Sequence, residues 1–234
     1  MKKVCIFSTG RSDYDLIKNL AISIKKEKKF KLQLIITGSH VSKRFGNQWK
    51  TIKDDKLNIY KKFKSIYYTK QELNPALSMS AVIKNLSRIF RNNKPDIIFL
   101  LGDRHEVMAA ASTALIFNIP IAHIHGGEIT EGAYDNSIRH AISKIANIHF
   151  VATKLSKKRI IQMGESPKNI FLTGGLATEI IQKTKLLNKK NLKELLKISF
   201  KNNNFLVTIH PTTLENSKIK IQMSELFKAL DFFK

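Results

Sequence analysis

Several short runs in this sequence place acidic side chains directly after an apolar stretch. The clearest is Gly102-Asp103-Arg104-His105-Glu106, which follows the apolar residues 97–101. A carboxylate that is partly buried at the end of a strand can exchange a proton near neutral pH, because burial raises its pKa. Asp103 is therefore a candidate general base. The structural alternative is that Asp103 caps a helix expected over residues 104–117.

A second run, His123-Ile124-His125-Gly126-Gly127-Glu128, ends the next apolar stretch. Strand alternation would send His123 and His125 to the same side, and paired glycines let a ligand approach the backbone. A His-x-His pair also occurs in metal sites, yet no third ligand stands at a diagnostic spacing, so we predict no metal. Acid–base chemistry or contacts with sugar hydroxyls by His125 and Glu128 fit the run better.

A third run, Tyr134-Asp135-Asn136-Ser137-Ile138-Arg139-His140, is expected to open a helix. Asp135 and Arg139 are four residues apart and therefore share one helix face. Viewed alone, they would form a surface ion pair with Asp135 as a capping residue. Three such runs that converge on one edge of a sheet favour a catalytic site over that interpretation.

The amino-terminal run Ser8-Thr9-Gly10-Arg11-Ser12-Asp13 has the character of an anion site. Small residues form a turn that opens a helix, whose free N–H groups attract negative charge, and Arg11 adds a guanidinium for a phosphate. An ordinary turn with Ser12 or Asp13 as the N-cap explains the run equally well. The G-x-G-x-x-G dinucleotide pattern is absent from it.

The hydrophobic pattern supplies a scaffold for these runs. Short apolar runs alternate with segments of helical period, which predicts an α/β architecture. Runs that are apolar throughout suit strands buried on both faces, so we expect a doubly wound parallel sheet. The predicted strands cover residues 4–7, 32–36, 97–101, 119–124, 148–151, 170–172 and 205–209. Helical stripes lie at residues 16–24, 83–90 and 138–145.

The composition of the chain changes near Gly174-Gly175. We assign residues 1–175 to a Rossmann-like domain, residues 176–203 to a linker with a surface helix, and residues 204–234 to the start of a second α/β domain. The last predicted strand runs into His210-Pro211. One strand and one helix cannot bury their own apolar faces, so the second domain is expected to be incomplete.

The charge balance is strongly basic. In 234 residues, 41 Lys and Arg against 18 Asp and Glu give a formal net charge of +23. This balance raises the question of an anionic partner, but the lysines are dispersed in pairs such as Lys25-Lys26, which is typical of a solvated surface. Cys5, the single cysteine, lies in an apolar run and excludes an intramolecular disulfide. With no recognisable signal peptide or membrane span, we predict a cytoplasmic protein with no membrane or nucleic-acid partner.

Taken together, the runs resemble those of the hydrolysing UDP-N-acetylglucosamine 2-epimerases of sialic acid and related nonulosonic acid biosynthesis. The resemblance extends along essentially the whole chain. Its most specific part is residues 123–140, which includes Thr130-Glu131-Gly132. Residues 10–14, residues 100–104 and His210-Pro211 add to it.

The resemblance implies both a fold and a reaction. The fold would be a two-domain glycosyltransferase-B type with the active site in the cleft between the domains. The enzyme would remove the C2 proton of UDP-N-acetylglucosamine, eliminate UDP to give 2-acetamidoglucal, and add water to release N-acetylmannosamine. By this resemblance, the substrate would be a nucleotide sugar, and no metal or other cofactor would take part.

The resemblance also implies roles for particular residues. Asp103 and Asp135 match the family's catalytic carboxylates. Arg11 matches a residue at the diphosphate end of the substrate, and His210 matches a histidine contributed by the second domain. The predicted substrate-binding residues are Gly10, Arg11, Ser12, Arg139 and His210.

The sequence departs from the family in two places. Many relatives have a carboxylate where this chain has His125, and Glu128 follows three residues later, so the acid–base role falls to either or both. Family members also carry a full second domain, whereas this sequence stops at Lys234. We therefore expect weakened UDP binding in an interrupted or split epimerase, whose partner is a second copy or a complementing carboxyl-terminal half.

Several alternatives stay open. The same chemistry could act on a UDP- or GDP-linked diacetamido-trideoxy sugar of the legionaminic acid route, because nothing fixes the contacts at C4 and C6. A non-hydrolysing epimerase fits residues 123–128 less well. A basic module for nucleic acid would show salt-steep binding and stacking aromatics, and an inactive fragment would only dimerise with an intact relative.

Overall fold

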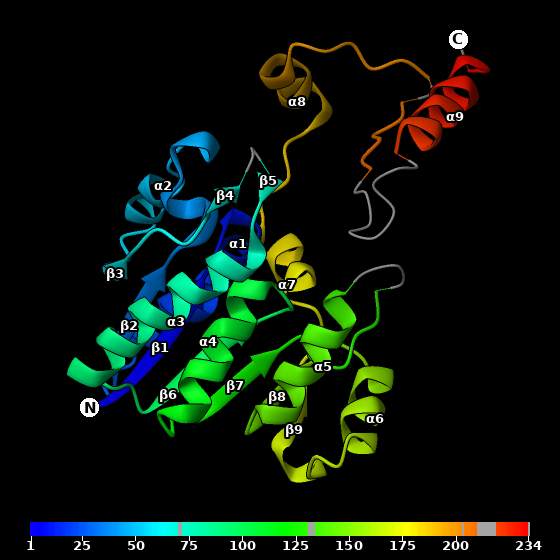
Figure 1. Ribbon diagram of the computed structural model, residues 1–234. Coiled ribbons are helices and arrows are strands. Elements are labelled where there is room, and N and C mark those ends of the chain that lie inside the picture. Colours follow the sequence, from blue (N-terminus) through cyan, green and yellow to red (C-terminus); the bar gives the residue numbers. More distant parts are fainter. Residues whose placement is uncertain (70–71, 131–133, 203, 210–218, 234) are drawn as a thin grey trace. The chain divides into compact units, whose positions relative to one another are not determined.

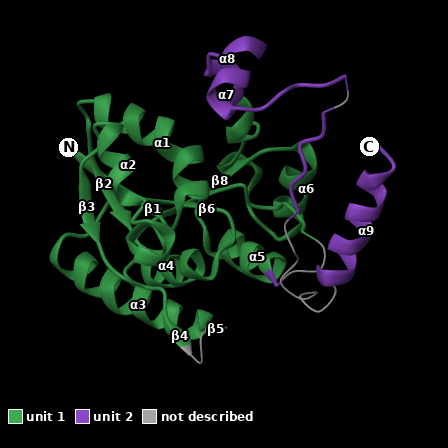
Figure 2. Cartoon of the chain, turned by 90° about the horizontal axis from the view of Figure 1, so that it is seen from above, with its two compact units in different colours: residues 1–130, 135–178 green, residues 131–134, 179–234 purple. Residues whose placement is uncertain are grey.

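The chain is seen here in a computed structural model with two compact units. Residues 1–130 and 135–178 form the first unit, and residues 131–134 and 179–234 form the second (Figure 2). The structure describes residues 1–69, 72–130, 134–202, 204–209 and 219–233.

The first unit contains a seven-stranded sheet in the order β3-β2-β1-β6-β7-β8-β9, and every pairing in it is parallel (Figure 1). The predicted doubly wound α/β class is therefore confirmed. The strands are β1 (Lys2–Ser8), β2 (Phe30–Ile36), β3 (Ile59–Lys62), β6 (Ile97–Leu101), β7 (Ile121–Ile124), β8 (Ile148–Val151) and β9 (Ile170–Leu172).

Sequence analysis missed three strands of this unit. β3 is an edge strand whose residues Lys61 and Lys62 are exposed, so it has no continuous apolar run. Lysines on an edge strand discourage pairing with another chain. The other two, β4 (Tyr68–Thr69) and β5 (Glu72–Leu73), form a short antiparallel pair apart from the main sheet.

Helices cover both faces of the sheet, as the doubly wound class requires. Side chains of α3, α4 and α5 form one hydrophobic core with the sheet, and side chains of α1 and α2 form the other. The helices of the first unit are α1 (Arg11–Lys26), α2 (Trp49–Asp54), α3 (Pro75–Asn92), α4 (His105–Ile116), α5 (Asp135–Ile145), α6 (Lys154–Gln162) and the start of α7 (Leu176–Lys183). Single-turn helices η1 (Gly38–Val41), η2 (Lys43–Phe45) and η3 (Pro167–Asn169) lie between them.

The central strand β1 shows why its sequence is apolar throughout. Cys5 and Phe7 point into the core under α3 and α4, whereas Val4 and Ile6 point into the core under α1. Alternate residues therefore need apolar side chains on both faces. The Cys5 thiol is fully buried and burial raises its pKa, which is typical of a structural thiol.

The strand order fixes where a ligand would bind. From β1 the chain moves outward to β2 and β3, and then returns to β6 on the other side of β1. In open α/β sheets, ligands bind at such a reversal, outside the carboxyl ends of the strands. In this chain those ends are Ser8 of β1 and Leu101 of β6, and Ile124 of β7 is adjacent to Leu101.

The second unit contains most of α7, then α8 (Lys189–Leu196) and α9 (Ile219–Asp231). The predicted strand at residues 205–209 is wrong. A strand needs a hydrogen-bonded neighbour, and the described residues of this unit provide none. The Phe205 ring instead packs against the Phe233 ring, with centroids 5.1 Å apart. Nowhere in the described ranges is a helix both long and apolar enough to cross a bilayer.

Candidate active site

The turn after β1 is closed by its own side chains. The Thr9 amide donates to the Asp13 carboxylate at 3.2 Å, and the Thr9 hydroxyl donates to the same oxygen. Ser12 Oγ donates to the other Asp13 oxygen at 3.2 Å. Gly10 occupies the N-cap position of α1. The interpretation of Ser12 or Asp13 as the N-cap is wrong, because both residues lie inside the helix.

Arg11 projects from this turn into solvent. Its Nε donates to Asp15 Oδ2 at 3.2 Å, and 73% of its side chain is exposed. Its backbone amide donates to Gln48 Oε1 at 3.1 Å. Because an exposed pair of this kind contributes little free energy, the guanidinium can turn toward an incoming anion at small cost.

The segment after β2 supports the same turn, and sequence analysis missed it. The Ser39 amide donates to Thr9 O at 2.8 Å, and a Cβ on Gly38 would lie 2.3 Å from that oxygen. His40 is buried, with Nε2 2.9 Å from Ser8 Oγ, and burial lowers its pKa to about 4. The neutral imidazole is therefore a fixed part of the turn. A Gly-Ser-His run after a predicted strand was the available signal.

An ion pair joins the turn after β6 to α5. Arg139 Nη2 donates to the Asp103 carboxylate and also to Thr130 Oγ1, the latter at 3.2 Å. Only 8% of the Arg139 side chain is exposed, and its Nη1 atom is buried without a hydrogen-bond partner among the described residues. The interpretation of Asp103 as a helix cap is wrong, because α4 begins at His105 and Arg104 holds the cap position.

Asp135, the first residue of α5, lies near this pair. Burial raises the pKa of the Asp135 carboxyl and the Asp103 carboxylate raises it further, while Arg139 acts in the opposite direction. The expected surface pair between Asp135 and Arg139 is replaced by the bond from Arg139 to Asp103, 36 residues away in sequence. The carboxyl groups of Asp103 and Asp135 therefore lie in different environments. In an active site, this difference allows one carboxyl group to act as an acid and the other as a base.

A second charged cluster lies at the start of α4, and sequence analysis gave it no role. Arg104 donates from Nε and Nη2 to the two oxygens of Glu106, at 3.2 and 3.3 Å. The Glu106 side chain is 1% exposed, whereas 40% of the Arg104 side chain is exposed. Burial lowers the pKa of the neighbouring His105. The Arg104 charge also acts to lower the pKa of Asp135 at the start of α5 and of His40 after β2, in each case as a smaller contribution than burial.

His123 and His125 differ in their surroundings. His123, in β7, is fully buried and donates from Nε2 to Gly102 O at 2.8 Å, while its Nδ1 lies 3.1 Å from Ser143 Oγ. Burial lowers its pKa to about 4. The prediction that His123 and His125 share a side does not hold, because β7 ends at Ile124 and His125 turns to φ +62°.

His125 contacts Glu128 instead. Its Nδ1 lies 3.3 Å from Glu128 Oε1, and its Nε2 accepts a hydrogen bond from the Leu176 amide at 3.4 Å. Of the two glycines between them, Gly127 is required, since it has φ +75° and a backbone oxygen next to the place of its Cβ, whereas a Cβ on Gly126 would displace a side chain. A Cβ on Gly126 would lie 2.7 Å from Ser143 Oγ, and one on Gly127 would lie 2.5 Å from Ser156 O.

The structure thus brings Asp103, Asp135 and Arg139 together, and places His125 and Glu128 on the neighbouring turn. Gly10, Arg11 and Ser12 lie at the turn after β1. His210 lies outside the described residues. Across the part of the chain that the structure describes, no group of three or more His, Cys, Asp or Glu side chains is placed to hold a metal ion.

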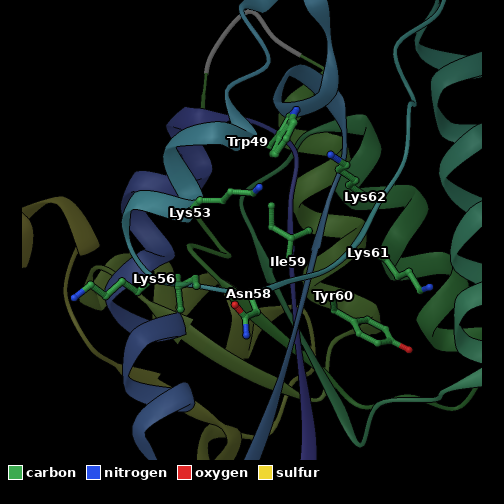
Figure 3. A pocket seen from close by; sticks show the side chains of 9 residues that line it. Trp49, Lys53, Lys56, Asn58, Ile59, Tyr60, Lys61 and Lys62 are labelled. Atoms are coloured by element: carbon green, nitrogen blue, oxygen red, sulfur yellow. The ribbon is translucent and has the colours of Figure 1, made fainter.

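A separate hollow of about 720 Å³ lies between α2 and β3 (Figure 3), and none of the predicted site residues lines it. Its lining is rich in lysine. Lys62 Nζ lies 3.4 Å from the centre of the Trp49 ring and Lys53 Nζ lies 5.2 Å from it, which are cation–π distances. These lysines cover the indole, and the lining has no carboxylate or imidazole for proton transfer.

The fold and the position of the charged groups define a class: a doubly wound α/β domain with an ionisable site at the reversal of strand order, where such proteins bind their ligands. Comparison with known proteins then narrows this class. The family model described as UDP-N-acetylglucosamine 2-epimerase matches residues 22–233, and the chain belongs to that family.

Two curated relatives match the whole chain. One, from Campylobacter jejuni, is described as GDP/UDP-N,N'-diacetylbacillosamine 2-epimerase (hydrolyzing) and is 39% identical over 233 residues. The other, from Escherichia coli, is described as polysialic acid biosynthesis protein P7 and is 36% identical over 234 residues. The chain spans 60% of the length of each.

Solved structures of the family share the fold. The UDP-N-acetylglucosamine 2-epimerase of Neisseria meningitidis, solved with UDP-N-acetylglucosamine bound, matches with a TM-score of 0.67 at 19% identity. The match covers 84% of this chain and 53% of that one. The sheet and helices of the first unit are therefore those of this family.

Proposed function

We propose that this protein is a hydrolysing UDP-N-acetylglucosamine 2-epimerase, which converts its substrate and water into N-acetylmannosamine and UDP. The observation that carries the proposal is the pair of carboxyl groups beside the reversal of strand order. Asp103 is paired with the Arg139 guanidinium, and Asp135 has a raised pKa. Family membership supports the nucleotide sugar as the substrate class.

The first step needs a base near C2 of the sugar. A carboxylate takes the C2 proton, the bond between C1 and the UDP oxygen breaks, and a double bond forms between C1 and C2. The products of this step are 2-acetamidoglucal and UDP, which leaves with the electron pair of the broken bond. Arg11 and the amides near Gly10 and Ser12 suit the diphosphate, because a guanidinium and helix N–H groups stabilise a leaving phosphate.

The second step adds water across the double bond. The hydroxyl goes to C1 and a proton goes to the opposite face of C2, which inverts that carbon and gives N-acetylmannosamine. A carboxyl that holds its proton near neutral pH suits the proton delivery, and the raised pKa of Asp135 favours that form. Asp103 and Glu128 are the candidates for the base, His125 acts beside Glu128, and Arg139 and His210 bind substrate.

A second substrate is favoured by one observation. The Campylobacter jejuni relative and a Legionella pneumophila relative, 33% identical over 230 residues, are both described as hydrolysing epimerases of N,N'-diacetylbacillosamine nucleotides. The same two steps would apply to that sugar, because they involve only C1, C2 and the leaving diphosphate. We therefore keep it as the alternative substrate.

The test is proton NMR of the chain incubated in heavy water with UDP-N-acetylglucosamine, and in parallel with UDP- or GDP-linked diacetylbacillosamine. We expect free N-acetylmannosamine that carries deuterium at C2, together with UDP. Asp135→Asn, prepared in the same way, is the matched inactive control. Formation of a UDP-linked mannosamine would overturn the hydrolysing mode, and a higher kcat/KM for the bacillosamine nucleotide would reassign the substrate.

A further inference from the structure

The turn that carries His125 is fixed from several directions. The His125 amide donates to Phe150 O of the neighbouring strand at 2.9 Å. Arg159 Nη1 donates to Gly127 O at 3.0 Å, and the backbone of Gly127 passes so close to Ser156 that no Cβ fits between them. His125 itself has φ +62°, a left-handed conformation that histidine adopts more readily than most residues. These contacts fix the backbone of the turn from which the His125 ring projects.

The two nitrogens of this ring face different partners. Nε2 accepts from the Leu176 amide at 3.4 Å. Leu176 is the first residue of α7, so its N–H has no partner within the helix and is available for this contact. A nitrogen that accepts a hydrogen bond carries no proton, so the neutral ring carries its proton on Nδ1. That nitrogen lies 3.3 Å from Glu128 Oε1.

Exposure separates the two side chains further. The His125 side chain is 21% exposed and the Glu128 side chain is 34% exposed. The His125 imidazole is therefore the less exposed of the two side chains, and the Glu128 carboxylate is the more open to an incoming substrate. Contacts between catalytic groups are commonly long in the unliganded state and shorten when substrate binds, so a separation of 3.3 Å suits such a pair.

We infer that His125 is a positioning residue, held by the Leu176 amide in the Nδ1–H tautomer, and that it orients the Glu128 carboxylate, which is the group of the two that meets the substrate. The inference rests on the proposed function, because it assigns the acid–base role within that site.

Two substitutions at His125 separate positioning from simple packing. The Asn side chain ends near the place of Nδ1 and tolerates positive φ, so His125→Asn keeps a donor for Glu128. The Gln amide reaches the place of Nε2 and leaves Glu128 without that donor. We expect His125→Gln to lower kcat by about 100-fold with little change in KM. The kcat of His125→Asn should be about tenfold higher than that of His125→Gln. Equal losses in both variants would overturn the inference.

The decisive measurement needs no turnover. In the full chain labelled with ¹⁵N-histidine, the His125 ring is assigned by comparison with His125→Asn, and its tautomer is read from long-range proton–nitrogen spectra. We expect a protonated Nδ1 and an unprotonated Nε2 in the native chain. Leu176→Pro removes both the amide donor and the leucine side chain at the first helical position, where proline is well tolerated. Leu176→Ala shortens the side chain but keeps the donor, and therefore isolates the effect of the amide.

Each outcome has one meaning. A shift of His125 toward the Nε2–H tautomer in Leu176→Pro, with none in Leu176→Ala, supports the inference. An Nε2–H tautomer in the native chain, or the same tautomer in native chain and Leu176→Pro, overturns it. If the native tautomer is as expected but no nucleotide sugar is turned over, the proposed function fails while the geometry of the His125–Glu128 pair stands.

Discussion

The turn after β1 and the turns after β6 and β7 lie on the same edge of the sheet but are built differently. Around β1, backbone and neutral groups hold adjacent turns together, as the Ser39 amide does with Thr9 O and Ser8 Oγ does with His40 Nε2, and the charged pair Arg11–Asp15 is exposed. Around β6 and β7, charged side chains that are partly or fully buried pair with one another, as Arg139 of α5 does with Asp103.

We interpret the turn after β1 as a rigid support and the turns after β6 and β7 as the place where charged groups can react. A turn held by backbone and neutral groups keeps its shape and leaves the exposed Arg11 guanidinium for an anion, which suits recognition of a phosphate. Burial raises the pKa of the Asp135 carboxyl, and the nearby Asp103 carboxylate raises it further. Ionisable groups perturbed in this way are typical of catalysis. We therefore expect substitutions at the two places to affect different quantities.

The largest expected effect is on turnover at the β6 side. Asp135→Asn should lower kcat by about 10²- to 10⁴-fold. Its stability at neutral pH should not fall, because the native state disfavours the charge that this substitution removes. Asp103→Asn should lower kcat by a similar factor and also lower the free energy of unfolding, because it leaves the buried Arg139 guanidinium without its carboxylate.

The control for both is Asp96→Asn, which changes an exposed aspartate before the amino end of the same strand. Steady-state kinetics and urea denaturation on the three variants give the comparison. Native-like turnover in Asp135→Asn would contradict a catalytic role for the charged groups near the carboxyl end of β6.

The next effect is on stability at the β1 side. Gly38→Ala should lower the free energy of unfolding by about 2–5 kcal/mol, because it combines left-handed backbone strain with overpacking. Gly38 has φ +60°, and its Cβ would lie 2.3 Å from Thr9 O. Gly46→Ala is the matched control, with φ +75° and no atom within 4 Å of its Cβ. Gly46→Ala should lower the free energy of unfolding by the backbone strain alone, about 1–2 kcal/mol, in the same urea titration.

A loss of stability of similar size is expected when the pH is lowered. His123 has a pKa of about 4 in the native state, below its ordinary value of 6.5. As the pH falls from 6.5 to 4, the unfolded chain gains a proton that the native chain does not, so stability present above pH 6.5 is lost. The loss from this residue is at most roughly 3 kcal/mol.

Urea denaturation at neutral pH and at about pH 4.5 measures this loss. His123→Gln should flatten the dependence of stability on pH. His140→Gln should flatten it less, because His140 is only partly buried. An unchanged slope in His123→Gln would contradict the assignment of a neutral, buried His123.

The smallest expected effect is at Arg11. Its pair with Asp15 is exposed, so Arg11→Ala should change the free energy of unfolding by less than about 1 kcal/mol. The proposed diphosphate contact predicts a rise in KM for the nucleotide sugar of about tenfold, the equivalent of about 1.4 kcal/mol. Asp15→Ala breaks the same pair and serves as the control, with KM unchanged. Equal KM values for the two variants would remove Arg11 from the substrate site.

Local sequence predicted most of the sheet correctly. The apolar runs at residues 97–101, 148–151 and 170–172 are strands with those bounds, because a strand buried on both faces must be apolar at every position. The edge strand β3 has no such requirement and was missed. Residues 205–209 have the composition of a strand, but hydrogen bonding to a neighbour, which composition does not reveal, decides whether a strand forms.

The sequence by itself determined the class of fold, the family to which the chain belongs, and the runs in which the candidate site residues lie. It could not determine which charges pair, because Arg139 is four residues from Asp135 yet binds Asp103, which is distant in the chain. Nor could it determine that His123 is locked in the core while His125 turns toward Glu128. Those outcomes depend on how parallel strands bring distant turns to one edge and on which side chains burial removes from water, and the tertiary structure alone decides both.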